Sequence, residues 1–557
     1  MAWADMPESV RKRYTWENGI LSLGRAMISD YYVRPLRRLK SPQGEWEYLE
    51  IAYVVGDEER VHVMTLRLDD FLSMELPVQM MCNDYKRSSR GELLILLKMQ
   101  MRQLPEPGWY IDSVGWHLLE GQWIYCAGGE IFPQNPGVEW DIARDIREKY
   151  QIRYDDRAPE EILDSMQALI QLNCIPANLC LVYLVTGLLR TLFFSLDIPP
   201  RFLLYLCGST GTYKTTLANY FFDLYRRGDG TSFASEDFTS SEAALQSRIL
   251  RFRDCVFVLD DLSPGVNSRE TTRKENMANN FIRTAANCEK RLIKSGKQLQ
   301  GAGFECSIAI TAENILELES LVNRTLLVDM DKYPLNQETL AFLLHHPALV
   351  PSFVRLFLMW AAENTELICR SIRSFWDNYR ENHDQETPAE HPRLRDTMNI
   401  LSISTQILLY FFELQNLDVS SFAGSFVEAM DVVQRDEEHV LRGLHSRNVR
   451  YDISREIVNL INTQQIMQTM PAFGGEAYIH DEYLYIQPKY LLEQLEKVIN
   501  DEEFSVHKLS SYLGKKGLLV KDNSRDYTKK NSNGKRYYQI DLKRLEEETN
   551  LYLMTSV

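Results

Sequence analysis

The chain has 557 residues, with 62 Lys and Arg against 78 Asp and Glu, which gives a formal net charge of −16 at pH 7. Hydrophobic residues make up 45% and charged residues 25% of the sequence, as in ordinary globular proteins. This composition excludes a disordered, collagen-like or disulfide-framework protein, and about three or four domains are expected from the length. The acidity also excludes histone-like coating of nucleic acid by the whole chain.

The cysteines and the apolar segments of the sequence indicate in which cellular compartment the protein is expected. The nine cysteines form no C-x-x-C pair, which predicts reduced core thiols in a cytoplasmic protein. The first residues lack the apolar stretch of a signal peptide. Residues 175–196 approach the length of a membrane span, but Pro176 and Arg190 favour a buried helix. We therefore expect no membrane partner.

The N-terminal part is predicted to be rich in strands. Residues 31–135 contain apolar and aromatic runs broken by glycine, with one helix expected over 90–103. The segment P-Q-N-P-G at 133–137 is typical of a linker, and residues 158–196 have helical patterns.

From 201 to 330, short apolar runs alternate with helical segments. The expected strands lie at 202–207, 231–234, 255–259, 307–311 and 324–330. The expected helices lie at 215–226, 240–250 and 273–291, with a short helix before the last strand. Such alternation predicts a parallel sheet with helices on both faces, an α/β core.

Helical signals dominate residues 335–450, and the tail has a different order. A helix and a strand pair follow residue 452, then a helix at 506–516 and two strands around N-S-N-G at 531–534. The order helix–strand–turn–strand predicts a winged helix. We expect a strand-rich α+β domain over 1–140, the α/β core over 141–334, a helical region over 335–450 and a winged-helix domain over 451–557.

The strongest motif is G-S-T-G-T-Y-K-T-T, which follows a strand and opens a helix. In that context backbone N–H groups cradle nucleotide phosphates, Lys214 reaches the β- and γ-phosphates, and the Thr215 hydroxyl binds Mg²⁺. Tyr213 stands where a P-loop has its second glycine. The alternative is a Gly/Thr-rich turn with an incidental lysine. The predicted nucleotide-binding residues are Gly208, Ser209, Thr210, Gly211, Thr212, Tyr213, Lys214, Thr215 and Thr216.

A second motif, D-C-V-F-V-L-D-D at 254–261, is an apolar strand that ends in two carboxylates. Since Mg²⁺ prefers hard oxygen ligands, Asp260 is the predicted metal ligand beside Thr215. Asp261 is predicted to orient or deprotonate the attacking water. The pair predicts an ATP hydrolase that uses Mg²⁺, and the alternative is a solvated acidic turn.

Two further strands carry candidate catalytic residues. Thr311 and Asn314, in S-I-A-I-T-A-E-N, either polarise the attacking water or cap the next helix. Arg324 begins a strand after a short helix, where a cation can project into the nucleotide of a neighbouring subunit as an arginine finger. A surface ion pair is the alternative for Arg324.

Together these motifs resemble an AAA+ ATPase core, in the segments G-S-T-G-T-Y-K-T-T, V-L-D-D-L-S-P-G, I-A-I-T-A-E-N and N-R-T-L-L-V-D-M. They are similar to the "domain of unknown function 927" helicase-like ATPases of bacterial mobile elements. The upstream S-V-G-W-H-L-L-E-G-Q-W-I-Y-C-A-G-G-E-I resembles the strand-rich region of that family. The resemblance covers roughly residues 30–335. It implies a P-loop NTPase with a helical lid that forms an oligomeric ring, expected to be a hexamer, and that translocates on or unwinds DNA.

The segment 289–304 is basic and contains three glycines, as a hairpin would. By resemblance to minichromosome-maintenance and viral ring helicases, this hairpin projects into a central channel. Arg291, Lys294 and Lys297 would bind the phosphates of a single DNA strand there. The alternative is a solvated basic loop.

The segment 508–544 holds eleven Lys and Arg against three Asp, a net charge of +8 in an acidic chain. A winged helix uses such a face to grip the DNA backbone, although some winged helices bind only proteins. The predicted contacts are Lys515, Lys516, Lys535 and Arg536.

The sequence thus predicts a helicase, translocase or replication initiator of a mobile genetic element, driven by Mg-ATP and acting on DNA. The main alternative is a nucleotide-dependent regulatory or defence ATPase that does not unwind DNA. A protein-remodelling machine is disfavoured by the basic hairpin, and an inactive P-loop scaffold is the remaining reading.

Overall fold

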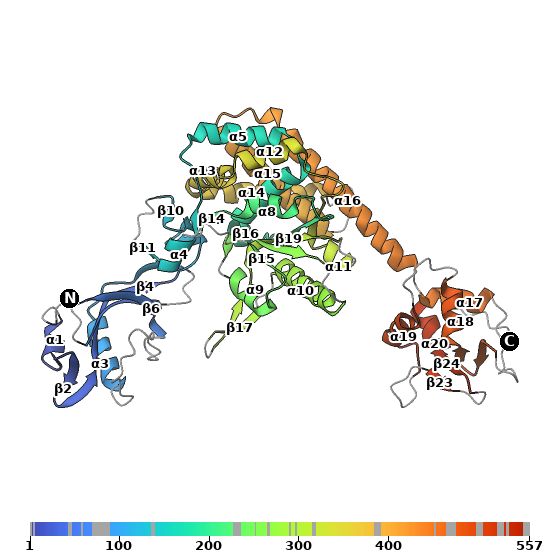
Figure 1. Ribbon diagram of the computed structural model, residues 1–557, viewed down its shortest axis with the longest axis horizontal. Helices are drawn as coiled ribbons and strands as arrows, with labels where there is room; N and C mark the ends of the chain where they lie inside the picture. The colour runs from blue at the N-terminus through green and yellow to red at the C-terminus, as the bar shows by residue number, and fades with distance from the viewer. Residues whose placement is uncertain are drawn as a thin grey trace. The chain divides into compact units, whose positions relative to one another are not determined.

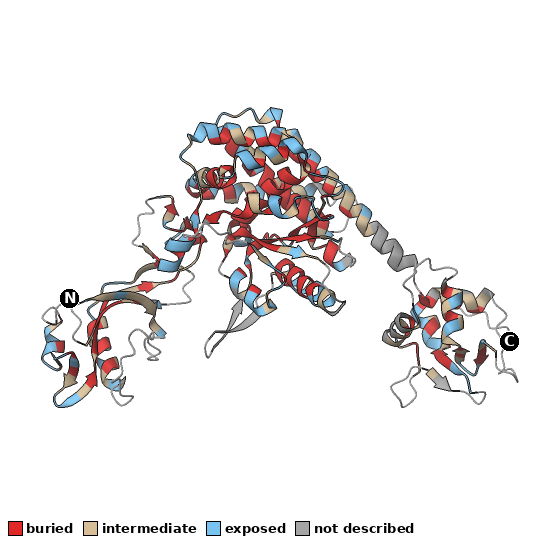
Figure 2. Cartoon of the chain, in the orientation of Figure 1, coloured by how far each residue is buried: buried red, intermediate tan, exposed pale blue. Residues whose placement is uncertain are grey.

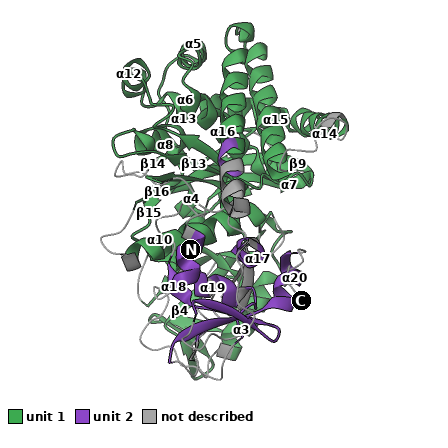
Figure 3. Ribbon diagram, turned by 90° about the vertical axis from the view of Figure 1, so that its right-hand side faces the viewer, with its two compact units in different colours: residues 1–438 green, residues 439–557 purple. Residues whose placement is uncertain are grey.

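The structure is a computed structural model. It describes the whole chain except residues 1–2, 4–5, 43–46, 57–59, 70–89, 135–139, 227–234, 251, 264–267, 289–290, 296–297, 315–318, 384–391, 451–452, 464–474, 497–504, 521–527, 531–533 and 550–557. The chain forms two compact units, Met1–Glu438 and His439–Val557, which Figure 3 distinguishes by colour.

The N-terminal part of the first unit is rich in strands, as predicted. It begins with α1 (Glu8–Arg11), β1 (Thr15–Glu17), β2 (Ile20–Leu23) and β3 (Ala26–Ser29). A five-stranded sheet in the order β11-β7-β4-β5-β6 follows, built from β4 (Tyr31–Lys40), β5 (Glu47–Val55), β6 (His62–Arg67), β7 (Gly108–Ile111) and β11 (Trp140–Ile142). The helix α3 (Arg90–Met101) confirms the helix expected at 90–103, and its leucines join the core of this sheet.

The centre of the first unit is a parallel sheet in the order β15-β16-β19-β13-β20. Its strands are β13 (Leu203–Cys207), β15 (Ser235–Asp237), β16 (Arg253–Leu262), β19 (Glu305–Ala312) and β20 (Thr325–Asp329). The predicted α/β core is confirmed, while the strand expected at 231–234 lies outside the described residues. Because β19 lies between β13 and β16, the carboxyl ends of these three strands meet side by side.

Helices cover both faces of the parallel sheet. They are α8 (Lys214–Phe222), α9 (Glu242–Ile249), α10 (Ser268–Asn287) and the short α11 (Glu319–Val322). Figure 1 shows α8 and α10 on opposite sides of the sheet. Figure 2 shows that the strands between them are largely buried, which explains their near-continuous apolar sequences.

The helix expected at 215–226 was predicted too long. It ends at Phe222, and the chain continues into β14 (Tyr225–Arg226), which pairs with β12 (Gln151–Ile152). The Tyr225 side chain is buried, and its ring lies 5.7 Å from that of Tyr150. This packing and strand pairing override the helical preference of the sequence.

Helices also precede and follow the α/β core in the sequence. Before the sheet come α4 (Arg144–Lys149), α5 (Pro159–Gln171), α6 (Ile175–Leu188) and α7 (Arg190–Ser195). After it come α12 (Gln337–His345), α13 (Leu349–Glu363), α14 (Thr365–His383), α15 (Pro392–Leu414) and α16 (Ala423–Arg450), so the helical region predicted at 335–450 is confirmed. Every residue of α6 from Pro176 to Leu188 is buried, which confirms the buried helix predicted for this apolar stretch.

Membrane spans were searched among the described residues. None of their helices is by itself long and apolar enough to cross a bilayer. Only α12 and α13 reach the required length and composition together, and they are bent by 69° at the break between them.

A small sheet of β8 (Gly115–Leu119), β9 (Gln122–Ala127) and β10 (Glu130–Phe132) connects the strand-rich part to the parallel sheet. Its connection centres on Asp254, a fully buried residue of β16. Asp254 Oδ2 accepts hydrogen bonds from Trp116 N and Thr191 Oγ1, both at 2.8 Å, and Oδ1 accepts one from Thr191 N at 2.7 Å. Burial raises the pKa of Asp254 to about 6, against the effect of these hydrogen bonds and of Arg253.

Gly115 is required by this contact. Its φ is +94°, and a Cβ atom there would lie 2.6 Å from Asp254 Oδ2. The G-W pair of the sequence therefore has a structural explanation: glycine allows the strand to approach Asp254, and the adjacent Trp116 is buried, with its indole N–H donated to Leu188 O at 2.8 Å.

The second unit has the element order expected of the tail. It contains α17 (Ile453–Thr463), β21 (Ala477–His480), β22 (Tyr483–Ile486), α18 (Pro488–Glu496), α19 (Val506–Lys515), β23 (Thr528–Lys530), β24 (Arg536–Asp541) and α20 (Leu542–Thr549). The strands form one sheet in the order β21-β22-β24-β23. The helix and the two strands predicted around 531–534 are confirmed, whereas the winged-helix assignment stays a prediction.

Candidate functional site

The loop Gly208–Tyr213 connects β13 to α8 at the carboxyl edge of the parallel sheet. Gly208 has a φ of +153°, and a Cβ atom there would lie 3.1 Å from Met330 Cβ. Lys214, the first residue of α8, folds back over the loop. Its Nζ donates to Gly208 O at 2.7 Å and to Ser209 O at 2.9 Å, and lies 3.3 Å from Thr212 Oγ1. The loop thus surrounds a lysine ammonium, as a phosphate-binding loop does.

Tyr213 explains why a P-loop normally has glycine at its position. Its φ of +63° and ψ of 25° are left-handed, a conformation that costs a non-glycine residue about 1–2 kcal/mol. The side chain is 47% exposed. The ring therefore does not block the loop, and the departure from the motif is accommodated by local strain.

We expect this strain to decide which substitutions the loop tolerates. Tyr213→Gly should leave ATP affinity within a factor of about two, because glycine adopts the left-handed conformation freely. Tyr213→Val should weaken ATP binding about tenfold, since a β-branched residue disfavours that conformation further. Isothermal titration with ATP measures both, and equal affinities of the two variants would contradict this explanation.

Asp260 lies between two hydroxyl groups. Its Oδ1 accepts hydrogen bonds from Thr215 Oγ1 of α8 at 2.7 Å and from Thr311 Oγ1 of β19 at 2.5 Å. Thr311 Oγ1 also accepts from Asp261 N at 3.0 Å, so this one buried threonine holds both residues of the acidic pair. The Thr215 hydroxyl and the Asp260 carboxylate present adjacent hard oxygen atoms, and such a donor set fits Mg²⁺.

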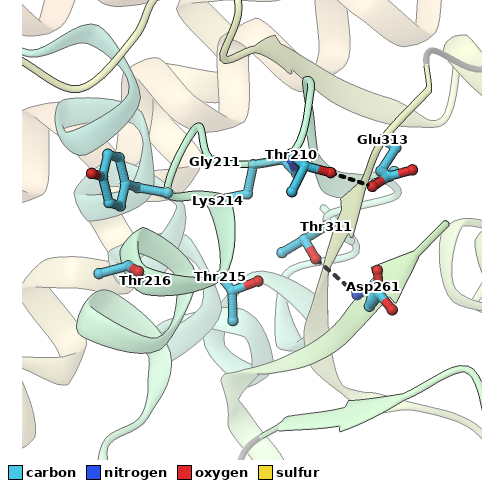
Figure 4. Close-up of a pocket in the computed structure, with 10 residues that line it drawn as sticks. Thr210, Gly211, Lys214, Thr215, Thr216, Asp261, Thr311 and Glu313 are labelled. Atoms are coloured by element: carbon cyan, nitrogen blue, oxygen red, sulfur yellow. Dashed lines mark hydrogen bonds between the residues drawn. The ribbon is translucent and has the colours of Figure 1, made fainter.

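A cavity of about 280 Å³ opens beside this cluster. Figure 4 shows Lys214, Thr215, Asp261 and Thr311 around it, contributed by the P-loop and by two neighbouring strands. The lining consists of Thr210, Gly211, Tyr213, Lys214, Thr215, Thr216, Asp261, Thr311, Ala312 and Glu313. Apart from Tyr213 these residues come from the loop, the first turn of α8 and the ends of strands, and their side chains are small, polar or charged, which suits the phosphates of a nucleotide better than its base.

Two further carboxylates lie at the carboxyl edge of the parallel sheet, and the sequence analysis did not select them as candidates. Glu313 Oε1 accepts a hydrogen bond from Thr210 Oγ1 at 2.7 Å, and Asp331 binds Ser209 on the other limb of the loop. Glu313 follows β19 directly and Asp331 follows β20 by two residues. The rule that selected Asp260, a polar residue at the carboxyl end of a parallel strand, would have found both.

The two remaining catalytic candidates are not among the residues that line the cavity. Asn314 is exposed, and its backbone oxygen accepts a hydrogen bond from Tyr205 at 3.0 Å. Arg324 precedes β20, and its guanidinium donates to Ser320 O. Arg324 therefore lies at the amino end of a parallel strand whose carboxyl end is near the P-loop, so it does not face the P-loop of its own chain.

The candidate DNA-binding residues fall in two places. Arg291 and Lys294 belong to β17 (Arg291–Ser295), which pairs antiparallel with β18 (Gln298–Ala302), so the predicted hairpin is confirmed. Lys297 lies outside the described residues.

In the second unit, Lys515 ends α19, Arg536 begins β24, and Lys535 directly precedes that strand. Lys516 forms an ion pair with Glu548 and lies 5.6 Å from the centre of the Tyr512 ring.

Comparisons with known proteins show which solved structures have a similar fold. No family model and no curated protein matches the chain. A solved structure described as "SCCmec type IV Cch - active helicase" is similar over 97% of this chain and 99% of that chain, with a TM-score of 0.55 and 12% sequence identity. One described as the JCV helicase covers 44% of this chain and 73% of its own, with a TM-score of 0.21 and 14% identity, too low to carry an argument. The chain therefore shares its fold with a helicase over nearly its whole length, whereas membership of the "domain of unknown function 927" family stays a prediction.

Proposed function

We propose that the protein is a DNA helicase, translocase or replication initiator of AAA+ type, driven by Mg-ATP and belonging to a mobile genetic element. The observation that carries the proposal is the arrangement of Thr215, Asp260 and Thr311 beside a lysine-containing P-loop at the carboxyl edge of a parallel sheet. The likeness in fold to the structure described as "SCCmec type IV Cch - active helicase" supports the helicase part of this proposal.

The residues of the site divide the work of hydrolysis. The P-loop amides and Lys214 bind and orient the phosphates of ATP, and Thr215 and Asp260 would hold Mg²⁺, which neutralises phosphate charge when bound. Asp261 lines the cavity, and its backbone N–H donates to Thr311 Oγ1, which supports the proposal that Asp261 orients or deprotonates the attacking water. Asn314 is the second candidate for this task.

A ring is supported by the position of Arg324. Since Arg324 lies at the opposite end of β20 from the P-loop, a role in catalysis requires the nucleotide of a neighbouring subunit. Such an arginine finger stabilises the charge that develops on the γ-phosphate. We infer a homo-oligomeric ring, expected to be a hexamer, with ATP bound between subunits.

DNA contact is proposed for two basic elements. The β17–β18 hairpin carries Arg291, Lys294 and Lys297, which would bind the phosphates of one strand in a central channel. The second unit, read as a winged helix, would add Lys515, Lys516, Lys535 and Arg536. Because these contacts are to the backbone, binding would be independent of sequence and sensitive to salt.

Strand displacement tests the proposal. Wild-type protein should unwind a forked duplex in the presence of Mg-ATP, and single-stranded DNA should stimulate its ATPase activity. The double variant Lys294→Ala/Lys297→Ala should lose unwinding at least tenfold while it keeps basal ATP hydrolysis, because it removes two phosphate contacts outside the nucleotide site. The matched control is Lys98→Ala/Lys149→Ala, which removes two exposed lysines from helices far from the hairpin in sequence.

A regulatory or defence ATPase is the second candidate function, favoured by the acidic pair Asp260–Asp261. Asp261 is one methylene shorter than the glutamate common at that position, which suits slow turnover. In this case the protein would hydrolyse ATP at a measurable rate, and single-stranded DNA would not change that rate. No unwinding would be detected in the wild type or in any variant. ATP hydrolysis without any response to single-stranded DNA would therefore select this alternative over the helicase.

A further inference from the structure

The P-loop is held from outside by an acidic residue that the mechanism does not use. Asp331 Oδ2 accepts a hydrogen bond from Ser209 N at 2.8 Å, and its Oδ1 accepts one from Ser209 Oγ at 2.5 Å. These bonds lower the pKa of the Asp331 carboxyl, so it is ionised at neutral pH. Asp331 is not among the described residues that line the cavity. It therefore binds the loop without lying in the cavity where the phosphates are proposed to bind.

Asp331 belongs to a short turn, Asp329–Tyr333, that follows β20. Within the turn, Asp329 Oδ1 accepts from Asp331 N at 3.0 Å and from Lys332 N at 3.3 Å, and Asp329 O accepts from Tyr333 N at 2.9 Å. Met330 N also donates to Cys207 O, at 2.7 Å. Hydrogen bonds within the turn, and one to the strand that precedes the P-loop, thus fix the conformation of the turn.

The far side of the turn is bound to α16. Asp436 of this helix forms an ion pair with Lys332, and its Oδ2 accepts a hydrogen bond from Tyr333 Oη at 2.7 Å. The next residue, Glu437, is buried with a backbone hydrogen bond from Leu327 of β20, and burial raises its pKa well above the usual range. The same helix continues beyond Glu438 into the residues of the second unit.

We propose that Asp331 is a positioning residue for the P-loop and that the turn Asp329–Tyr333 couples nucleotide binding to α16. The inference rests on the proposed nucleotide-binding function of the loop. Any change in the loop on binding ATP is transmitted through Ser209 and Asp331 to the turn, and through Lys332 and Tyr333 to Asp436. Because coupling between two sites is reciprocal, loosening α16 must alter the affinity of the loop for nucleotide.

The experiment uses the full-length protein and two measurements. One is hydrogen exchange of the peptide that contains Gly208–Thr216, and the other is the affinity for AMP-PNP with Mg²⁺. Asp331→Ala should speed exchange and weaken binding about fivefold, the lower end of typical coupling, and Asp331→Asn, which keeps one acceptor oxygen, should be intermediate. Asp436→Ala should produce the same changes at a distance, whereas the matched control Asp431→Ala, an exposed position of the same helix, should produce neither.

The outcomes separate the inference from the proposed function. If Asp436→Ala behaves like Asp431→Ala in both measurements, the coupling is overturned, and if Asp331→Ala leaves exchange of the loop unchanged, the positioning role is overturned. If the wild type does not bind AMP-PNP but both variants speed exchange of the loop, the proposed function fails while the structural coupling stands. Thermal unfolding of each variant verifies that the fold is retained.

Discussion

Replacing Lys214 with alanine should lower kcat/KM for ATP hydrolysis by about 10³-fold, the upper range for loss of one preorganised group that stabilises a transition-state charge. Lys214 Nζ lies within hydrogen-bond distance of Gly208 O, Ser209 O and Thr212 Oγ1. The variant therefore loses both the ammonium that would meet the phosphates and the cation around which the loop is arranged. Phosphate release from Mg-ATP under steady-state conditions measures the effect.

The control for this experiment is Lys149→Ala, which removes an exposed lysine of α4 and should retain full activity. Circular dichroism of both variants separates loss of chemistry from loss of fold. More than a tenth of the wild-type hydrolysis in Lys214→Ala would mean that the P-loop is not the catalytic site, and it would favour the reading of an inactive scaffold.

The substitution Asp254→Asn should destabilise the first unit by about 3 kcal/mol, the magnitude expected when a buried, charged hydrogen-bond acceptor is lost. Each carboxylate oxygen accepts a backbone N–H, Oδ1 from Thr191 and Oδ2 from Trp116. Whichever way an asparagine is oriented, its NH₂ group must face one of these donors. The shape of the side chain is thus preserved while one buried N–H loses its acceptor.

Calorimetric unfolding of the full chain measures this prediction through the Tm of the first unit. The matched control is Asp164→Asn, an exposed aspartate on α5 that should change stability by less than about 0.5 kcal/mol. If Asp254→Asn lowers the Tm no more than Asp164→Asn, the Asp254 network does not contribute to stability as its geometry indicates.

Local patterns were sufficient to predict the elements that carry the site. The apolar runs before Gly208 and Asp260 end at the polar residues that the structure brings together, because buried parallel strands have uninterrupted apolar sequences and their carboxyl ends meet at one edge. The buried helix α6 was predictable for a similar reason, since Pro176 and Arg190 bound an apolar stretch with no polar face.

What the sequence could not predict depends on contacts between distant residues. The end of α8 at Phe222 follows from the pairing of Tyr225 with Ile152, which are 73 positions apart, and no local signal marks it. Likewise no local pattern indicates that the carboxylate of Asp254 accepts hydrogen bonds from Trp116 and Thr191. The position of Asp331 after a strand could have marked it as a candidate, but its hydrogen bonds with Ser209, 122 positions earlier, could not be predicted from the sequence.

The contact between Trp116 and Asp254 also affects when this part of the chain can fold during synthesis. A ribosome synthesises the β8–β9 hairpin 138 residues before the aspartate that receives its backbone N–H. At about 5–20 residues per second, this interval lasts roughly 7–30 s. Throughout it, the nascent chain carries a large indole and a glycine-containing strand without the surface that buries them. The small sheet of β8, β9 and β10 can therefore reach its final packing only after β16 has been synthesised.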